Sequence, residues 1–218
     1  MQHDGQMNLL TSLEELIFPV RCLGCGALGL EICSQCRKFW QPRIYRSHSR
    51  RKPYFPIYSS IPYSPIAGKV LLAAKEHALR RADELMVSAL SHSLSLCLQE
   101  QGIGFLVPIP SRKSVARLRG RQFISELTRE IGSGARVPTR ELLTHTRVVK
   151  DQSKLDAKKR VENLEGSLAS LRYHSGKAII VDDLITTGVT LQEAARALRA
   201  AGIEVSAAIT ACVAEPLR

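Results

Sequence analysis

The stretch AIIVDDLITTGVT, residues 178–190, is the most informative part of this chain. Its apolar start predicts a buried strand, and two adjacent carboxylates follow at the end where ligands bind in parallel α/β sheets. A short loop then leads into a predicted helix, which spans Thr190–Ala201 and is closed by Gly202. Backbone N–H groups and the helix dipole favour a phosphate at such a helix start.

These features together predict a site for a ribose 5-phosphate group. Asp182 and Asp183 can accept hydrogen bonds from two vicinal hydroxyls. The loop can hold the phosphate through hydroxyl donors and a glycine that lets the backbone approach, in the residues Thr186, Thr187, Gly188, Val189 and Thr190. Each feature alone would fit a plain strand followed by a capped helix, but their combination favours the ligand site.

The rest of the second half alternates strand and helix patterns, which predicts a parallel α/β sheet. The expected elements are a helical run over Ile66–Gln99, a strand over Phe105–Ile109, a basic loop over Ser111–Arg121, a helix over Gln122–Ile131, and strands over Lys177–Val181 and Ile203–Val213. Further helices are expected over residues 7–18 and around residues 154–164.

Four cysteines form two pairs, Cys22-x-x-Cys25 and Cys33-x-x-Cys36. Each pair can present two thiolates to one ion from a tight turn, and two pairs complete a tetrahedral zinc site. Two disulfides, or four reduced cysteines without a metal, are the alternatives. Structural zinc is favoured, because disulfides are rare in the cytoplasm, where we expect this protein.

The chain is divided by composition into three parts. We expect an N-terminal helix and zinc module over residues 1–40, and an α/β domain over residues 66–218. Residues 37–65 contain five prolines and the run Arg50–Lys52. They predict an irregular segment, with a linker arm over residues 41–65.

The net charge of +11 is concentrated in two blocks. Residues 1–60 hold eight basic and four acidic residues, and residues 103–150 hold ten and three. Such blocks suggest contact with a nucleic acid or a phosphorylated small molecule, although solubility alone is an alternative. No segment has the length and apolar character of a signal peptide or membrane span, which is the ground for the expected cytoplasmic location.

The stretch of residues 178–190 resembles the signature of type I phosphoribosyltransferases, which bind phosphoribosyl pyrophosphate with magnesium. The resemblance implies a parallel sheet flanked by helices, with Asp182 and Asp183 on the ribose hydroxyls and Thr186–Thr190 on the 5-phosphate. The family holds pyrophosphate in a loop after an early strand. The corresponding residues here are Ser111, Arg112 and Lys113.

Nearly the whole chain resembles one subgroup, the ComF family of competence-related proteins. The matching features are Phe18-Pro19, the paired cysteines, Lys75, Pro108 and Pro110, the segment Arg117–Gly120, and Arg147, Gln152, Leu155, Arg160 and Asn163. The resemblance implies a role in DNA uptake during natural transformation, with single-stranded DNA and a DNA-uptake ATPase as partners. The alternative is an active phosphoribosyltransferase that acts on an unidentified acceptor.

Overall fold

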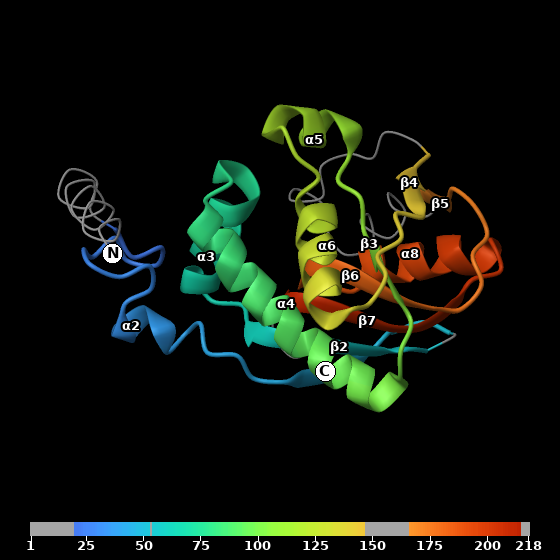
Figure 1. The fold of residues 1–218 in the computed structure, drawn as a ribbon, viewed down its shortest axis with the longest axis horizontal. Coiled ribbons are helices and arrows are strands. Elements are labelled where there is room, and N and C mark those ends of the chain that lie inside the picture. Colours follow the sequence, from blue (N-terminus) through green and yellow to red (C-terminus); the bar gives the residue numbers. More distant parts are fainter. Residues whose placement is uncertain (1–19, 53, 147–165, 215–218) are drawn as a thin grey trace, which may run out of the picture.

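A five-stranded sheet of order β1-β2-β7-β6-β3 forms the centre of the computed structural model (Figure 1). The structure describes residues 20–52, 54–146 and 166–214. The strands are β1 (Tyr45–His48), β2 (Pro56–Pro62), β3 (Phe105–Pro108), β6 (Lys177–Ile185) and β7 (Glu204–Val213). Strand β1 is antiparallel to β2, and all other neighbours are parallel.

The middle strands are buried on both faces, because helices cover the sheet from both sides. Long apolar runs such as Ala178–Val181 are typical of strands in this position. The pairing aligns Val107 of β3, Ile180 of β6 and Ala208 of β7 across the sheet. Parallel pairing also places the carboxyl ends of β2, β3, β6 and β7 at one common edge.

One face of the sheet is covered by three helices, α3 (Pro65–His77), α4 (Arg80–Gln101) and α6 (Phe123–Ala135). The other face is covered by α8 (Val189–Ala200) and by a small hairpin of β4 (Leu143–His145) and β5 (Leu168–Ser170) (Figure 1). Alternation along β6 serves both layers: Ile179 and Val181 belong to the first core, and Ala178 and Ile180 to the second.

The predicted fold class is confirmed, as are the elements between Phe105 and Val213 that fall on described residues, apart from the basic loop. The expectation of an irregular segment over residues 37–65 is wrong where β1 and β2 form. Strand β2 lies beside β7, with its five inner residues buried. Its two prolines occupy the first and last positions, where a missing N–H costs least.

One other expectation needs correction. The segment Ser111–Arg121 is not a simple loop, because Lys113–Arg119 forms helix α5, which ends at Gly120 with φ 70°. The expected helical run over Ile66–Gln99 is confirmed and consists of two helices, α3 and α4, separated at Ala78, whose φ is 48°. The helices predicted over residues 7–18 and around residues 154–164 lie outside the described residues.

The cysteine-containing segment packs directly on α3. Its buried residues Cys22, Ile32, Cys36 and Trp40 belong to the same apolar cluster as residues of α3 and α4. Nζ of Lys69 on α3 also donates a hydrogen bond of 2.7 Å to the carbonyl oxygen of Gly24. The second cysteine pair lies on a four-residue helix, α2 (Ser34–Arg37): Cys33 is its N-cap and Cys36 lies within it, shortly before Trp40. The segment and the sheet therefore share one core.

Candidate functional site

The predicted site residues gather at the carboxyl edge of the sheet. Strand β6 ends at Ile185 and is followed by Thr186–Gly188, and β3 ends at Pro108 and is followed by Ser111–Lys113. The two loops leave neighbouring parallel strands. The N–H of Ile109 donates to the carbonyl oxygen of Val181 over 3.0 Å, so the chain beyond β3 stays beside β6 up to the acid pair.

Asp182 and Asp183 lie within β6, just before its end at Ile185, rather than after the strand, and Asp182 is level with Thr210 of β7. Oδ1 of Asp182 accepts a 2.9 Å hydrogen bond from the backbone N–H of Asp183. Asp183 is buried, with 6% exposure, whereas Asp182 is partly exposed. The Asp183 carboxylate forms an ion pair through Oδ2 with Nζ of Lys75, near the end of α3.

The two acids and the lysine of this cluster shift one another's pKa values. Burial, and then repulsion by Asp183, raise the pKa of Asp182 well above its ordinary value, while Lys75 acts in the opposite direction. Burial opposes the charge of Lys75, but the two carboxylates outweigh it and raise the pKa of Lys75. The lysine is therefore charged at neutral pH and partly compensates the acid pair.

The loop between β6 and α8 has the geometry of an anion site. Gly188 is the N-cap of α8 and has φ 75°, a left-handed conformation that favours glycine. It supplies no side chain to cap the helix, so no side-chain cap occupies the first N–H groups of α8. Residues 187–190 are half-buried and Thr186 is exposed. The 12-residue helix directs its positive end at this loop.

The loop after β3 is held from two sides. The backbone N–H of Ser111 donates to Oε1 of Gln122 over 3.1 Å. Nε2 of His145 lies 3.0 Å from the carbonyl oxygen of Pro110 and must be the donor. Burial lowers the pKa of His145, the bond to Pro110 opposes this, and the charge of Arg112 adds to the lowering. The hairpin on the α8 side thus fixes the loop that carries Ser111, Arg112 and Lys113.

The outer arginines of the basic segment form ion pairs within the protein. Nε of Arg119 donates to Glu76 of α3 over 2.8 Å. The Arg121 guanidinium lies 2.7 Å from Asp83 and 2.8 Å from Glu126. The sequence does not predict Lys75 as the partner of Asp183, nor Glu76 and Asp83 as partners of these arginines. Of these residues, only Lys75 stands out in the sequence, as a position that matches the ComF family.

The four paired cysteines come together. Their Sγ atoms all lie within 4.8 Å of one another, and none forms a disulfide. A tetrahedral site with zinc–sulfur bonds of about 2.3 Å has sulfur atoms about 3.8 Å apart. The Sγ atoms of Cys25 and Cys33 are 3.7 Å apart, so the donor set fits zinc and could hold one ion.

The thiols differ in their readiness to ionise. Burial opposes ionisation of Cys22, but the backbone N–H groups of Cys33, Cys25 and Gly24 outweigh it and lower its pKa to about 6. Burial, and then the neighbouring thiols, raise the pKa of Cys36 to about 12. Four clustered thiolates repel one another, and a divalent cation would relieve that repulsion.

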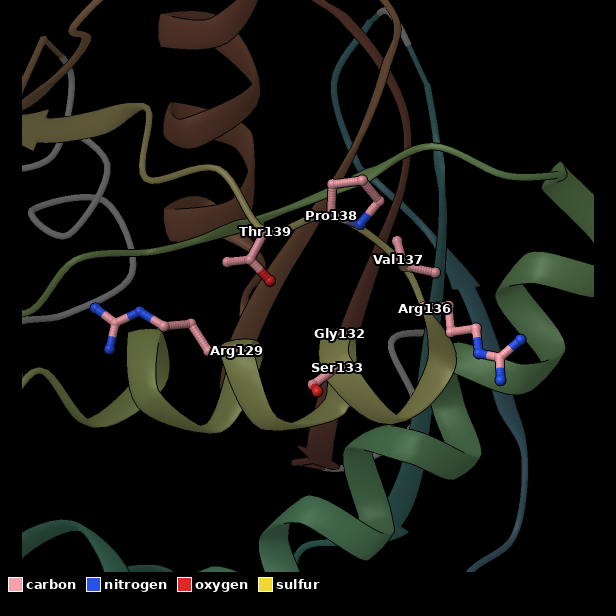
Figure 2. A pocket seen from close by; sticks show the side chains of 7 residues that line it. All are labelled: Arg129, Gly132, Ser133, Arg136, Val137, Pro138 and Thr139. Atoms are coloured by element: carbon pink, nitrogen blue, oxygen red, sulfur yellow. The ribbon is translucent and has the colours of Figure 1, made fainter.

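A hollow of about 380 Å³ lies elsewhere on the molecule. Figure 2 shows it between the last turns of α6 and the segment Val137–Thr139, which pairs through Thr139 with Leu106 near the start of β3. It therefore lies toward the opposite edge of the sheet from the acid pair. Among the described helices, none combines the length and apolar character needed to cross a membrane.

Comparisons with known proteins bear on the type of this domain. Residues 116–217 match the family model of the phosphoribosyl transferase domain. A comparison with curated proteins found no match. Solved structures with similarity include the allosteric regulatory enzyme of purine biosynthesis, at 19% identity and a TM-score of 0.34, over 52% of this chain and 23% of that one.

Adenine phosphoribosyltransferase from Leishmania donovani is similar at 10% identity and a TM-score of 0.36, over 83% of this chain and 80% of that one. The chain spans about a quarter of the purine-biosynthesis enzyme, and both TM-scores are low. The mostly parallel sheet and the match over residues 116–217 show that this chain contains a domain of the phosphoribosyltransferase type.

Proposed function

We propose that the protein binds phosphoribosyl pyrophosphate, or another ligand with a ribose 5-phosphate group, at the carboxyl edge of β3 and β6. The observation that carries the proposal is the continuous unit formed by β6, its acid pair, the Thr186–Gly188 loop and the start of α8. It places two carboxylates and an uncapped helix start within one short stretch of chain. Hydroxyl-accepting and phosphate-binding groups are thereby combined in a single site.

Each part of the ligand has a candidate partner. Thr186, Thr187, Gly188, Val189 and Thr190 would hold the 5-phosphate, while Asp182 and Asp183 would accept from the ribose hydroxyls. Ser111, Arg112 and Lys113 would face the pyrophosphate. Magnesium would arrive with the ligand and neutralise pyrophosphate charge. It needs no cage of protein ligands, since it is commonly bound through substrate phosphates and water.

Thermal unfolding tests this proposal directly. Phosphoribosyl pyrophosphate with magnesium should stabilise the protein by about 2.7 kcal/mol at roughly 100 times its dissociation constant. Inorganic phosphate should stabilise it less at the same concentration, because it lacks the ribose and the pyrophosphate. Absence of any shift at saturating ligand, with magnesium present, would remove the proposal.

We propose further that this binding function belongs to a ComF-like protein that assists DNA uptake. Support comes from the resemblance over nearly the whole chain and from the basic blocks. Arg119 and Arg121 are engaged in ion pairs within the protein, which leaves fewer cations of the basic segment to bind single-stranded DNA. On α5, the exposed Arg117 remains as a candidate, since Lys113 is assigned to the pyrophosphate.

Salt-dependent binding of a single-stranded oligonucleotide tests this role. Replacing Arg117 by alanine should weaken binding, and the lost phosphate contact should lower the salt slope by about 0.7. Arg80→Ala is a matched control, because its side chain is 92% exposed on another helix. Undetectable binding at low salt would leave the uptake role without support and would favour an enzyme.

The alternative function is transfer of phosphoribose to an acceptor. In that reaction the ribose carbon gains positive charge as pyrophosphate leaves, and the protein contributes by positioning and by stabilising the leaving group. The observation favouring it is the placement of Arg112 and Lys113 beyond the end of β3. Incubation with phosphoribosyl pyrophosphate, magnesium and a panel of bases should then release pyrophosphate only when the right acceptor is present.

We also propose that Cys22, Cys25, Cys33 and Cys36 hold a structural zinc ion. All four positions of a tetrahedral ion are filled by cysteine, so no open position remains for a substrate. Metal analysis of the purified protein should find one zinc ion per chain.

A further inference from the structure

Lys75 joins α3 to the acid pair across a long stretch of sequence. Its Nζ contacts Oδ2 of Asp183, and the carboxylate of Asp182 also stabilises its charge. The remainder of α3 is fixed by packing, since Ala67, Val70 and Ala74 are fully buried. The position of the ammonium group is therefore set by the fold and not by a freely moving surface chain.

Each carboxylate uses one oxygen inside the protein. Asp183 uses Oδ2 for Lys75, and Asp182 uses Oδ1 for the N–H of Asp183. Within the described part of the chain, neither second oxygen has a hydrogen-bond partner. One free acceptor on each of two adjacent carboxylates suits a pair of vicinal hydroxyls, each of which donates one hydrogen bond.

The charge of this cluster of Lys75, Asp182 and Asp183 also favours a ligand with neutral hydroxyl groups. Two adjacent carboxylates without a counter-charge either attract a divalent cation or share a proton. Lys75 supplies a permanent positive charge in direct contact with one of them. The cluster then keeps two acceptor oxygens but has only one net negative charge when both acids are ionised.

We propose that Lys75 is a positioning residue that holds Asp183 as a hydrogen-bond acceptor and sets the preference of the acid pair for neutral sugar hydroxyls. This inference rests on the proposed function, since it concerns the ribose part of the same site. The side chain of Lys75 is 32% exposed and Asp183 is buried, so removing Lys75 also leaves a buried carboxylate without its partner and costs stability. The ratio of two ligand affinities is therefore the readout, because a merely structural role would not move it.

The test compares two ligands that share the phosphate and differ in the sugar. Isothermal titration with ribose 5-phosphate and with inorganic phosphate gives the ratio of their affinities for each variant. Lys75→Met should lower that ratio about tenfold, which corresponds to about 1.4 kcal/mol. Lys75→Arg keeps the charge and should retain most of the ratio. Arg80→Met removes the same charge from an exposed position and should leave the ratio unchanged.

The outcomes separate this inference from the proposed function. If the wild type binds ribose 5-phosphate no better than phosphate, the proposed function fails and the inference fails with it. If the wild type prefers ribose 5-phosphate and Lys75→Met keeps the same ratio, only the inference is overturned. An equal loss for both ligands, or an equal fall of the ratio in Arg80→Met, would likewise overturn it.

Discussion

Gly24 is the position where the cysteine site tolerates the least change. A Cβ atom there would lie 2.7 Å from Sγ of Cys36 and 3.0 Å from Cγ2 of Ile66. Ordinary contacts between carbon atoms are about 3.5–4.0 Å, so Gly24→Ala must displace Cys36 or α3 by roughly 1 Å. Metal–ligand distances tolerate only about 0.2 Å, which makes the substitution a direct test of zinc ligation by Cys36.

Gly24→Ala should weaken zinc binding by about 10- to 100-fold, the range typical of changes beside a ligand. Overpacking should also cost about 1–3 kcal/mol of unfolding free energy, because the site shares its core with α3. Competition with a chromophoric zinc chelator measures the first effect, and thermal unfolding of the metal-loaded protein measures the second.

Gly134→Ala is the matched control, since no atom lies within 4 Å of its added Cβ and the residue is inside α6. It should leave zinc binding unchanged and, because Gly134 lies in the last turn of α6, should change the free energy of unfolding by less than about 1 kcal/mol. The reasoning is refuted if Gly24→Ala binds zinc as tightly as the wild type and unfolds at the same temperature.

Three further predictions follow from the same structure. Chelation of the metal should change the fluorescence of Trp40, the single tryptophan, because it is buried in the cluster that includes the cysteines; an unchanged spectrum after complete metal removal would count against the shared core. Arg121→Ala should cost about 1–3 kcal/mol by leaving Asp83 and Glu126 without their partner, while single-stranded DNA binding stays the same; a loss of DNA binding without a loss of stability would reverse this assignment. Zinc binding near neutral pH should release a proton from Cys36, whose pKa is raised to about 12, so affinity should fall as pH is lowered; titrations in buffers of different ionisation enthalpy measure the release, and Cys36→Ser would release as many protons as the wild type if Cys36 is not a ligand.

The predictable parts of this protein are those that are local in sequence. Strand, acids, loop and helix follow one another between Lys177 and Ala200, so their pattern specifies their arrangement directly. The cysteine pairs are equally local, and the structure brings their sulfur atoms together.

The sequence of strand β2 does not predict a strand, because its prolines and serines are typical of an irregular, exposed segment. Pro56 and Pro62 are usually read as breakers, and Ser59 and Ser60 look like residues of an exposed segment. In the fold these serines are buried and satisfied: Ser59 bonds Thr210 of β7, and Ser60 bonds Ser93 of α4. Only the neighbouring strand and helix make such a strand favourable, and neither is near in sequence.

The ion pairs at the site could not be predicted for a similar reason. Lys75 and Asp183 are separated by 108 residues, and Arg119 and Glu76 by 43. No local pattern links such partners, because the sheet topology alone brings α3 to the end of β6. One feature of the sequence does indicate the end of helix α5: Gly120 follows Arg119 and ends the helix with a positive φ.

The most direct test of the proposed phosphoribosyl site is a titration of phosphoribosyl pyrophosphate with magnesium against three proteins. Asp182→Asn replaces the second carboxyl oxygen by an amide group that cannot accept from a hydroxyl, without breaking the ion pair of Asp183, and Arg136→Ala alters the hollow of Figure 2 at the other edge of the sheet. The wild type and Arg136→Ala should bind with the same affinity, and Asp182→Asn should bind about tenfold or more weakly, since hydrogen bonds to charged groups contribute about 1.5–3 kcal/mol. Unchanged binding by Asp182→Asn together with weaker binding by Arg136→Ala would contradict the assignment and place the ligand in the hollow.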